Sequence, residues 1–545
     1  MTSSPFVPPH RLAAFGLTQP PLTPSTPSTP PAPAPEPDAN TMAATVYHAL
    51  PTAQQDEFKR LAAQGTLADT KGDDNHTLLY YLHKLVTTPR AAGLNPKTTL
   101  AETVDWLANP NDVNQDNAVT TQAERTALWQ AAQDPALPTG WATQHTVDDI
   151  SAKDAYNCGP ASILSRMAEE QPKELARLIE EASSPALLAT EVVQASDVKP
   201  SRTAAGAGVW ANLPPTAQAQ AVLQAANSQA TPLSPTAFKV SLPVPVSGLQ
   251  RAVLAQRHPT PFAGRGVEAL LYSLLVHNGS HHTYDAATDE RWGYLQNLSL
   301  VTNASFLNDD LKVNLINVLN NTGNPKLAKV RALAMLAATP TVDKAQGKAL
   351  IDSLFATENK GLYADEEILM QSILDDDVNW RNVEVQQLGN DPNTSNGSVL
   401  LGYKRSFEQT THDILQTLWQ GHAPVVGINF MDDEGYVRGG HIIKIGGYQV
   451  DPANHELWLL VSDSQDTHKG YVPKRASELI PMIHHMGLPD AIADNAETQI
   501  AANGPYAILL PDASDAQHFT LPSLWHDPNQ PNPFTSPSTP PSVTP

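Results

Sequence analysis

The sequence predicts an α+β fold in which helices and an antiparallel sheet occupy different parts of the chain. Residues 40–137 and 308–355 repeat apolar side chains at helical spacing. Residues 424–462 contain three short apolar runs, rich in Val, Ile and Leu and separated by turn residues, which is typical of a strand meander. We therefore expect the helices first and most of the strands near the end.

Both ends of the chain are rich in proline. Residues 20–37 hold nine prolines in eighteen positions, mixed with Ser, Thr and Ala. Such a segment buries too little apolar surface to fold, so we expect a disordered leader over residues 1–39. Residues 526–545 hold seven prolines in twenty positions and belong to a predicted Pro-rich tail over residues 513–545. Solvated spacers are the simplest interpretation of both ends, and binding of a partner or a secretion chaperone is the alternative.

Four regions are expected between these ends. Residues 40–140 form an N-terminal helical region, in which one helix face is shared by Leu78, Leu79, Leu82 and Leu85. Asn95–Pro96 opens another helix, and Thr121 with Glu124 forms a capping box at the start of a third. Residues 141–185 hold a first core segment, with Pro172 starting its second helix. Residues 186–397 form a mostly helical insertion, although residues 183–261 show no clear period. Residues 398–512 combine a helix at 407–419, ended by Gly421, with strands at 424–430, 441–448, 457–462 and 506–510.

Composition excludes several classes of function. The chain has 34 basic and 56 acidic residues, a net charge of −22, which disfavours nucleic acid and anionic membrane as partners. Its single cysteine permits no intramolecular disulfide. Neither a signal-peptide pattern nor an apolar run of about 18 residues is present. We expect no membrane span, and either a cytoplasmic location or secretion by a route that is independent of a signal peptide.

The single cysteine, Cys158, is the strongest candidate for chemistry. A lone cysteine is more often a small buried apolar residue than a nucleophile. Gly159 and Pro160 follow it, however, and proline is favoured at the first turn of a helix because its missing N–H needs no partner there. Cys158 is therefore predicted to lie at a helix N-terminus, where the helix dipole favours the thiolate form of a cysteine.

A cysteine nucleophile also needs a base and a group that orients the base. His441 begins one predicted strand and Asp463 follows the return strand; if the hairpin turns about Pro452, the two lie opposite each other with Cβ atoms about 5 Å apart. Asp451 competes, but it lies at the turn, about 33 Å away at about 3.3 Å per residue. Gly439 and Gly440 leave room beside the imidazole. This geometry favours His441 and Asp463.

Four stretches together resemble the papain-like cysteine peptidases, most closely the bacterial double-glycine leader peptidases of bacteriocin exporters. They are Asn157-Cys-Gly-Pro-Ala-Ser162, Leu418-Trp-Gln-Gly-His-Ala-Pro-Val-Val426, Gly439-Gly-His-Ile-Ile-Lys-Ile-Gly-Gly-Tyr448 and Val461-Ser-Asp463. The resemblance implies a core in which a helix bearing the cysteine packs on an antiparallel sheet bearing the histidine and the aspartate. The spacing of 283 residues between Cys158 and His441 then requires the large helical insertion.

The resemblance also implies an activity. Cys158 attacks a peptide or isopeptide carbonyl, His441 moves the proton, Asp463 orients His441, and Gln144 is the nearest glutamine for the oxyanion hole. A protein or peptide is the expected substrate, and no metal or organic cofactor is needed. The leader resembles those of secreted bacterial effectors. An acyl transferase, a deamidase or a peptidoglycan amidase with the same residues stays open, as does a non-catalytic interaction protein on the same scaffold.

Other polar groups carry weaker signals. His277, His281 and His282 lie near acidic residues but lack metal-ligand spacing, so a polar loop is the better interpretation. His484 and His485 are expected on a helix after Pro481. Residues 375–377, three successive aspartates, lack the pattern of a calcium loop and are expected at a helix end or in a solvated loop.

Overall fold

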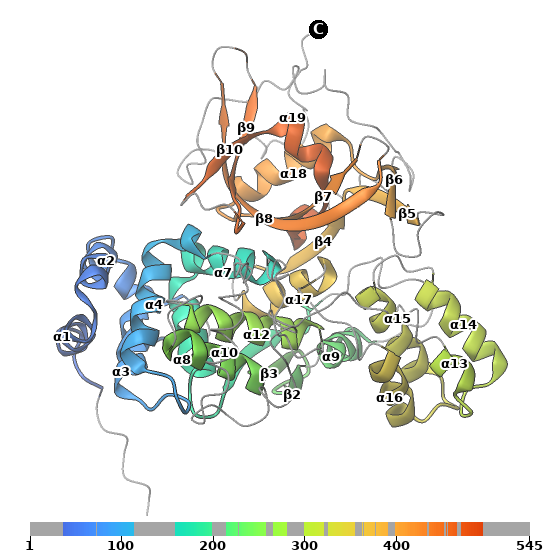
Figure 1. Cartoon of the computed structure of the whole chain (residues 1–545), viewed down its shortest axis with the longest axis horizontal. Helices are drawn as coiled ribbons and strands as arrows, with labels where there is room; N and C mark the ends of the chain where they lie inside the picture. The colour runs from blue at the N-terminus through green and yellow to red at the C-terminus, as the bar shows by residue number, and fades with distance from the viewer. Residues whose placement is uncertain are drawn as a thin grey trace, which may run out of the picture. The chain divides into compact units, whose positions relative to one another are not determined.

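The computed structural model describes most of the chain between residues 36 and 493. The described residues are 36–71, 74–113, 158–198, 214–226, 228–257, 265–280, 299–320, 325–354, 362, 364–375, 378–390, 398–432, 435–451, 454, 456–465 and 470–493. They form an α+β fold with helices and antiparallel strands, as predicted (Figure 1). Residues 36–39 of the predicted leader are described, and Ala39 begins a helix instead of ending the leader. Residues 1–35, the predicted tail, the predicted strand at 506–510, Thr121 and Glu124 lie outside the described residues.

The N-terminal part is helical, and the predicted start signal Asn95–Pro96 is in place. Thr77 caps the helix that buries Leu78, Leu79, Leu82 and Leu85. Asn95 accepts hydrogen bonds from the backbone of the next helix, whose first residue is Pro96. The elements are α1 (Ala39–Ala49), α2 (Thr52–Ala63), η1 (Thr66–Ala68), α3 (Leu78–Thr87), α4 (Pro96–Ala108) and η2 (Pro110–Asp112).

Two helices follow, α7 (Cys158–Glu170) and α8 (Pro172–Ala182). Pro172 starts α8 as predicted. Both helices belong to one apolar core that also includes α1, α3, α4 and residues up to Leu374. The predicted boundaries near residues 140 and 185 therefore divide the sequence, but they do not divide this core.

The region predicted as an insertion is mostly helical and also contains strands. Residues 183–261, which have no clear period, supply a three-stranded antiparallel sheet in the order β1-β3-β2. Helices α13 to α16 enclose a separate apolar core. The elements are β1 (Leu188–Gln194), α9 (Pro215–Ala225), β2 (Gln229–Pro232), β3 (Ala237–Pro243), α10 (Val246–Arg257), α12 (Gly266–Ser280), α13 (Ser299–Asn303), α14 (Asp309–Asn320), α15 (Pro325–Ala338), α16 (Lys344–Leu354) and α17 (Ala364–Leu374).

A six-stranded antiparallel sheet, in the order β10-β9-β8-β7-β11-β4, dominates the last part. Its strands β7, β8 and β9 form the predicted meander, and the edge strand β10 was not predicted. Strand β4 lies within the range predicted as insertion, so the boundary at residue 398 is too late. The elements are β4 (Trp380–Glu384), β5 (Gln386–Asn390), β6 (Ser398–Tyr403), α18 (Phe407–Trp419), β7 (Val425–Met431), β8 (Val437–Val450), β9 (Leu457–Ser462), β10 (Val472–Arg475), α19 (Ala476–Leu479), η5 (Ile480–Met482) and β11 (Ile483–Pro489).

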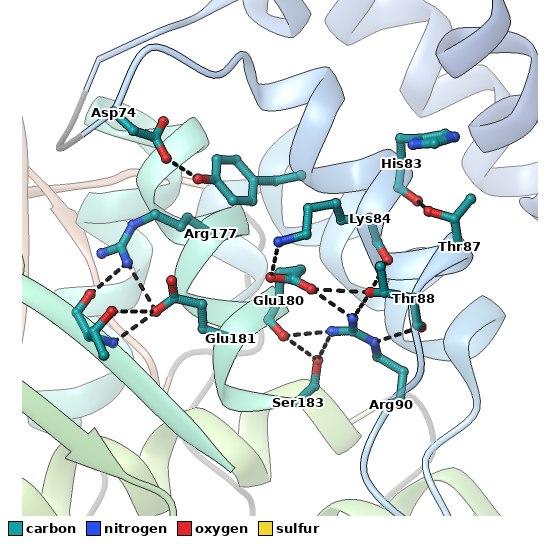
Figure 2. Close-up of polar contacts among 12 residues, drawn as sticks. Asp74, His83, Lys84, Thr87, Thr88, Arg90, Arg177, Glu180, Glu181 and Ser183 are labelled. Atoms are coloured by element: carbon teal, nitrogen blue, oxygen red, sulfur yellow. Dashed lines mark hydrogen bonds and ion pairs between the residues drawn. The ribbon is translucent and has the colours of Figure 1, made fainter. Parts of the chain in front are cut away.

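Helix α8 is almost wholly buried although half of its residues are charged. Its charges are satisfied by ion pairs and hydrogen bonds (Figure 2). Glu180 accepts from Lys84 at 3.1 Å and from Arg90 at 2.7 Å. Arg177 donates to Glu181 at 3.1 Å. The contacts of Glu180 join α8 to helix α3 and to the loop that follows it.

Candidate active site

Cys158 is the first residue of α7 and is partly exposed. The start of this helix presses closely on strand β8. A Cβ atom at Gly159 would lie 3.2 Å from Cδ1 of Ile442 and 3.4 Å from Cβ of Leu362, so a side chain next to Cys158 would be crowded. The hydroxyl of Ser162 donates to the carbonyl of Ile442 at 3.2 Å. Glycine and serine in the motif thus let α7 approach β8.

His441 lies on β8, opposite Ile428 of β7, and is 2% exposed. Its Nε2 atom lies 2.6 Å from Oδ1 of Asp463, which directly follows β9. The same oxygen accepts the backbone N–H of Gln465 at 2.9 Å. Asp463 is therefore held on one side by its own turn and hydrogen bonds the imidazole on the other.

The second ring nitrogen of His441, Nδ1, is the one available to Cys158. It is buried and makes no hydrogen bond that meets strict geometric limits. The Cys158 side chain nevertheless lies near enough to affect the imidazole through hydrogen bonding and charge. Cys158 therefore lies near the imidazole, without a hydrogen bond to Nδ1 in this structure.

The pKa of His441 reflects both partners. Burial alone would lower the pKa, because it disfavours the charged ring. The hydrogen bonds and negative charges of Asp463 and Cys158 outweigh burial and raise the pKa to about 10. His441 is therefore protonated at neutral pH.

The predicted hairpin register is wrong, although the pairing of His441 with Asp463 is right. Strand β9 pairs with β8 so that Ser462 lies opposite Lys444, and a bulge follows between Ile445 and Gly447. One further step places Asp463 beside Ile443 rather than His441. The turn is centred later than Pro452, because the hydrogen bond that closes it runs from the Asp451 N–H to the Glu456 carbonyl. The two residues thus meet diagonally.

Gly439 and Gly440 lie on β8 before His441, opposite Phe430 and Asn429. A Cβ atom at either glycine would meet nothing closer than 3.6 Å, so the surface beside His441 has room, as predicted. Gln144, the predicted oxyanion-hole residue, lies outside the described residues.

The weaker candidates take other places. Asp375 lies at a helix end, as one of the two predicted alternatives had it, directly after α17. It is buried and accepts from Arg166 at 2.6 Å and from the Trp380 indole at 2.6 Å. His484 and His485 are not helical but begin β11, because η5 ends at Met482. His277 lies on α12, while His281 and His282 lie outside the described residues.

Sequence reasoning missed a charged group beside this site. Lys444, three residues after His441, is fully buried and bonds Glu169 of α7 at 2.7 Å. A charged residue inside the apolar run Ile442–Ile445 was the available signal. Since a lysine is almost never fully buried without a partner, the run predicts a buried ion pair.

Comparison of the chain with protein-family models, with curated proteins and with solved structures finds no match. Across the described ranges, no three His, Cys, Asp or Glu side chains gather as a metal site would require. Among the helices that the structure describes, none is long and apolar enough to cross a membrane.

Proposed function

We propose that this protein is a papain-like cysteine peptidase, which hydrolyses amide or isopeptide bonds of a protein or peptide through Cys158, His441 and Asp463. One observation carries the proposal. His441 binds the Asp463 carboxylate through Nε2, and Cys158, at the start of α7, lies near enough to the same imidazole to raise its pKa. A nucleophile, a base and an orienting carboxylate in contact are what acyl transfer through a thioester requires.

The reaction follows from these contacts. The Cys158 thiolate attacks the carbonyl carbon, and the imidazolium of His441 gives its Nδ1 proton to the departing amine, which leaves a thioester on sulfur. A water molecule then attacks the thioester while Nδ1 takes one of its protons. The acid product leaves and the thiolate is regenerated. The backbone N–H of Cys158, at the start of α7, is one donor for the negative oxygen.

A thiol-directed electrophile tests the proposal. An ordinary thiol is only about 3% thiolate at pH 7, so a full thiolate reacts about tenfold faster after allowance for its lower nucleophilicity. We expect chloroacetamide to label Cys158 at least about tenfold faster than glutathione at pH 7. His441→Ala should slow the labelling, and Cys158→Ser should abolish it. Labelling of the unmodified protein at the glutathione rate would contradict the proposal.

A peptide library then distinguishes hydrolysis from transfer. Cleaved products should appear with the unmodified protein and be absent with Cys158→Ser. Products joined to an added amine would instead indicate an acyl transferase.

A further inference from the structure

Lys444 is a buried cation on the strand that carries His441. Its side chain is fully inaccessible, and Nζ donates to Oε2 of Glu169 at 2.7 Å and to the carbonyl of Ser165 at 3.4 Å. The hydroxyl of Tyr471 donates to the same Glu169 oxygen at 2.5 Å, and its ring lies 5.1 Å from Nζ. We call these three residues, Lys444, Glu169 and Tyr471, the lysine clamp.

The clamp joins three segments that are distant in sequence. Glu169 belongs to α7, Lys444 to β8, and Tyr471 precedes β10. The backbone is adapted to it, because β8 bulges at Gly446 and a Cβ atom there would overlap the Tyr471 ring. Burial alone would raise the pKa of Glu169, but the charge of Lys444 and the hydrogen bonds from both partners lower it. The ion pair is therefore maintained at neutral pH.

Stability alone does not account for this ion pair. Replacing a buried ion pair with apolar residues of similar volume is often neutral or stabilising. What a charged pair adds is geometric specificity, since Nζ must meet the carboxylate at one distance and direction.

The register of α7 on β8 shows what that specificity controls. Ser165 lies seven residues after Cys158, which is about 10.5 Å along a helix. Lys444 lies three residues after His441, which is about 10 Å along a strand. Ser162 bonds the carbonyl of Ile442, and Ser165 and Glu169 bond Lys444, so α7 runs along β8 from the residue next to His441 to Lys444.

We propose that Lys444 is a positioning residue. Through Glu169 and Tyr471 it holds α7 at the position along β8 that brings the Cys158 sulfur next to Nδ1 of His441. This inference rests on the proposed function, since it gives the clamp its purpose. A displacement of about 1 Å in a reacting group lowers rates by about 100-fold, so the axial position of α7 matters.

The decisive variants are Lys444→Met and the double variant Lys444→Met with Glu169→Leu. Glu169 is 40% exposed, so water can solvate its carboxylate when Lys444 is lost and the single variant should fold. We expect the rate of chloroacetamide labelling at pH 7 to fall about tenfold in both variants. The rate should rise with pH as it does for an ordinary thiol, with a midpoint of about 8.5. The double variant should melt at the wild-type temperature or above and still react slowly, which a purely structural role does not predict.

Lys84→Met is the matched control. Lys84 also pairs with a glutamate, Glu180, but it belongs to α3 (Figure 2). Its Nζ atom lies 5.6 Å from the centre of the Tyr80 ring. Its labelling rate should equal that of the unmodified protein.

Two results would overturn the inference. One is rapid labelling with an unchanged pH profile in a folded Lys444→Met protein. The other is an unchanged labelling rate in Tyr471→Phe, the variant to use if both Lys444 variants fail to fold. Tyr471→Phe removes only the hydroxyl, and we expect it to slow labelling about threefold relative to the unmodified protein. Slow labelling of the unmodified protein refutes the proposed function instead, so the two failures are distinguishable.

Discussion

The Nε2 atom of His441 lies 2.6 Å from Oδ1 of Asp463, although these residues are not cross-strand partners. The observed register places Asp463 beside Ile443, two residues from His441. Residues two apart on a strand share a face, and diagonal neighbours lie about 7 to 8 Å apart, within reach of a histidine and an aspartate. The pair therefore depends on side-chain length as well as on register.

Asp463→Asn should lower the pKa of His441, because it removes a negative charge and a hydrogen bond that raise it. In the unmodified protein we expect the ring to titrate near 10 by nuclear magnetic resonance. Peptide hydrolysis should fall by about 100- to 10,000-fold in the variant. An unchanged ring pKa would show that Asp463 does not hold the imidazole in solution.

The raised pKa of His441 also predicts the sign of a stability effect. The unfolded ring titrates near 6.5 and the folded ring near 10, so the folded state binds an extra proton between these values. The stabilisation is complete below pH 6.5 and is lost as pH rises through about 10. Melting curves of the unmodified protein and His441→Gln should therefore converge with rising pH over this range, and curves that diverge would contradict the assignment.

Cys158→Ala tests the other contact of the imidazole. Because the Cys158 side chain raises the pKa of His441, its removal should lower that pKa while the Asp463 hydrogen bond stays. The titration of the His441 ring measures this directly. Lys348→Met, at an exposed pair in α16, is the control and should leave the ring pKa in place.

Arg166→Met should strongly destabilise the protein. Arg166 and Asp375 are both fully buried and pair at 2.6 Å, so the variant leaves a buried carboxylate without its cation. Breaking such a pair costs about 3 to 5 kcal/mol. Lys348→Met, at an exposed pair in α16, should cost less than about 1 kcal/mol. Chemical denaturation measures both, and equal effects would contradict the burial argument.

Glu367→Gln should stabilise the protein increasingly as pH rises above 4.5. Glu367 is fully buried on α17 beside His485, and burial raises its pKa well above 4.5, against a smaller opposing effect of the Gln371 hydrogen bond. Above pH 4.5 the unfolded carboxyl ionises while the folded one stays neutral, which lowers stability by about 1.4 kcal/mol per pH unit until the folded group ionises.

Melting temperatures at pH 4.5 and 7.5 check this effect. Asp56→Asn, at a side chain that is 78% exposed, is the control and should show no comparable change. A Glu367→Gln variant that gains no stability with pH would show that Glu367 is ionised in the folded protein.

Local signals predicted much of the fold. Capping and periodicity predicted the starts of α4 and α8 and both ends of α18. In the structure, Ser406 caps the first turn of α18, and Gly421, just after its end, has a φ of 93°. Residues 183–261 escaped prediction because β1 and β3 are short and gain their stability by pairing with each other.

The site was predicted in part, for similar reasons. Cys158 lies at a helix start because Gly159 and Pro160 specify one locally. The contact of His441 with Asp463 was expected from a hairpin shifted by two residues, and an even shift keeps both side chains on one face. Lys444 and Glu169 were missed because their partnership spans 275 residues and no local pattern encodes it.

The separation of Cys158 from Asp463 by 305 residues has a consequence for biosynthesis. At about 5 to 20 residues per second, a ribosome needs roughly 15 to 60 seconds to proceed from the cysteine codon to the aspartate codon. Through that interval the nucleophile exists without its base, so the growing polypeptide should carry an inert thiol. A nascent chain arrested before residue 441 should label no faster than glutathione, and a chain released in full should label rapidly. Under the proposed function, the long spacing delays activity until Cys158, His441 and Asp463 have all been translated.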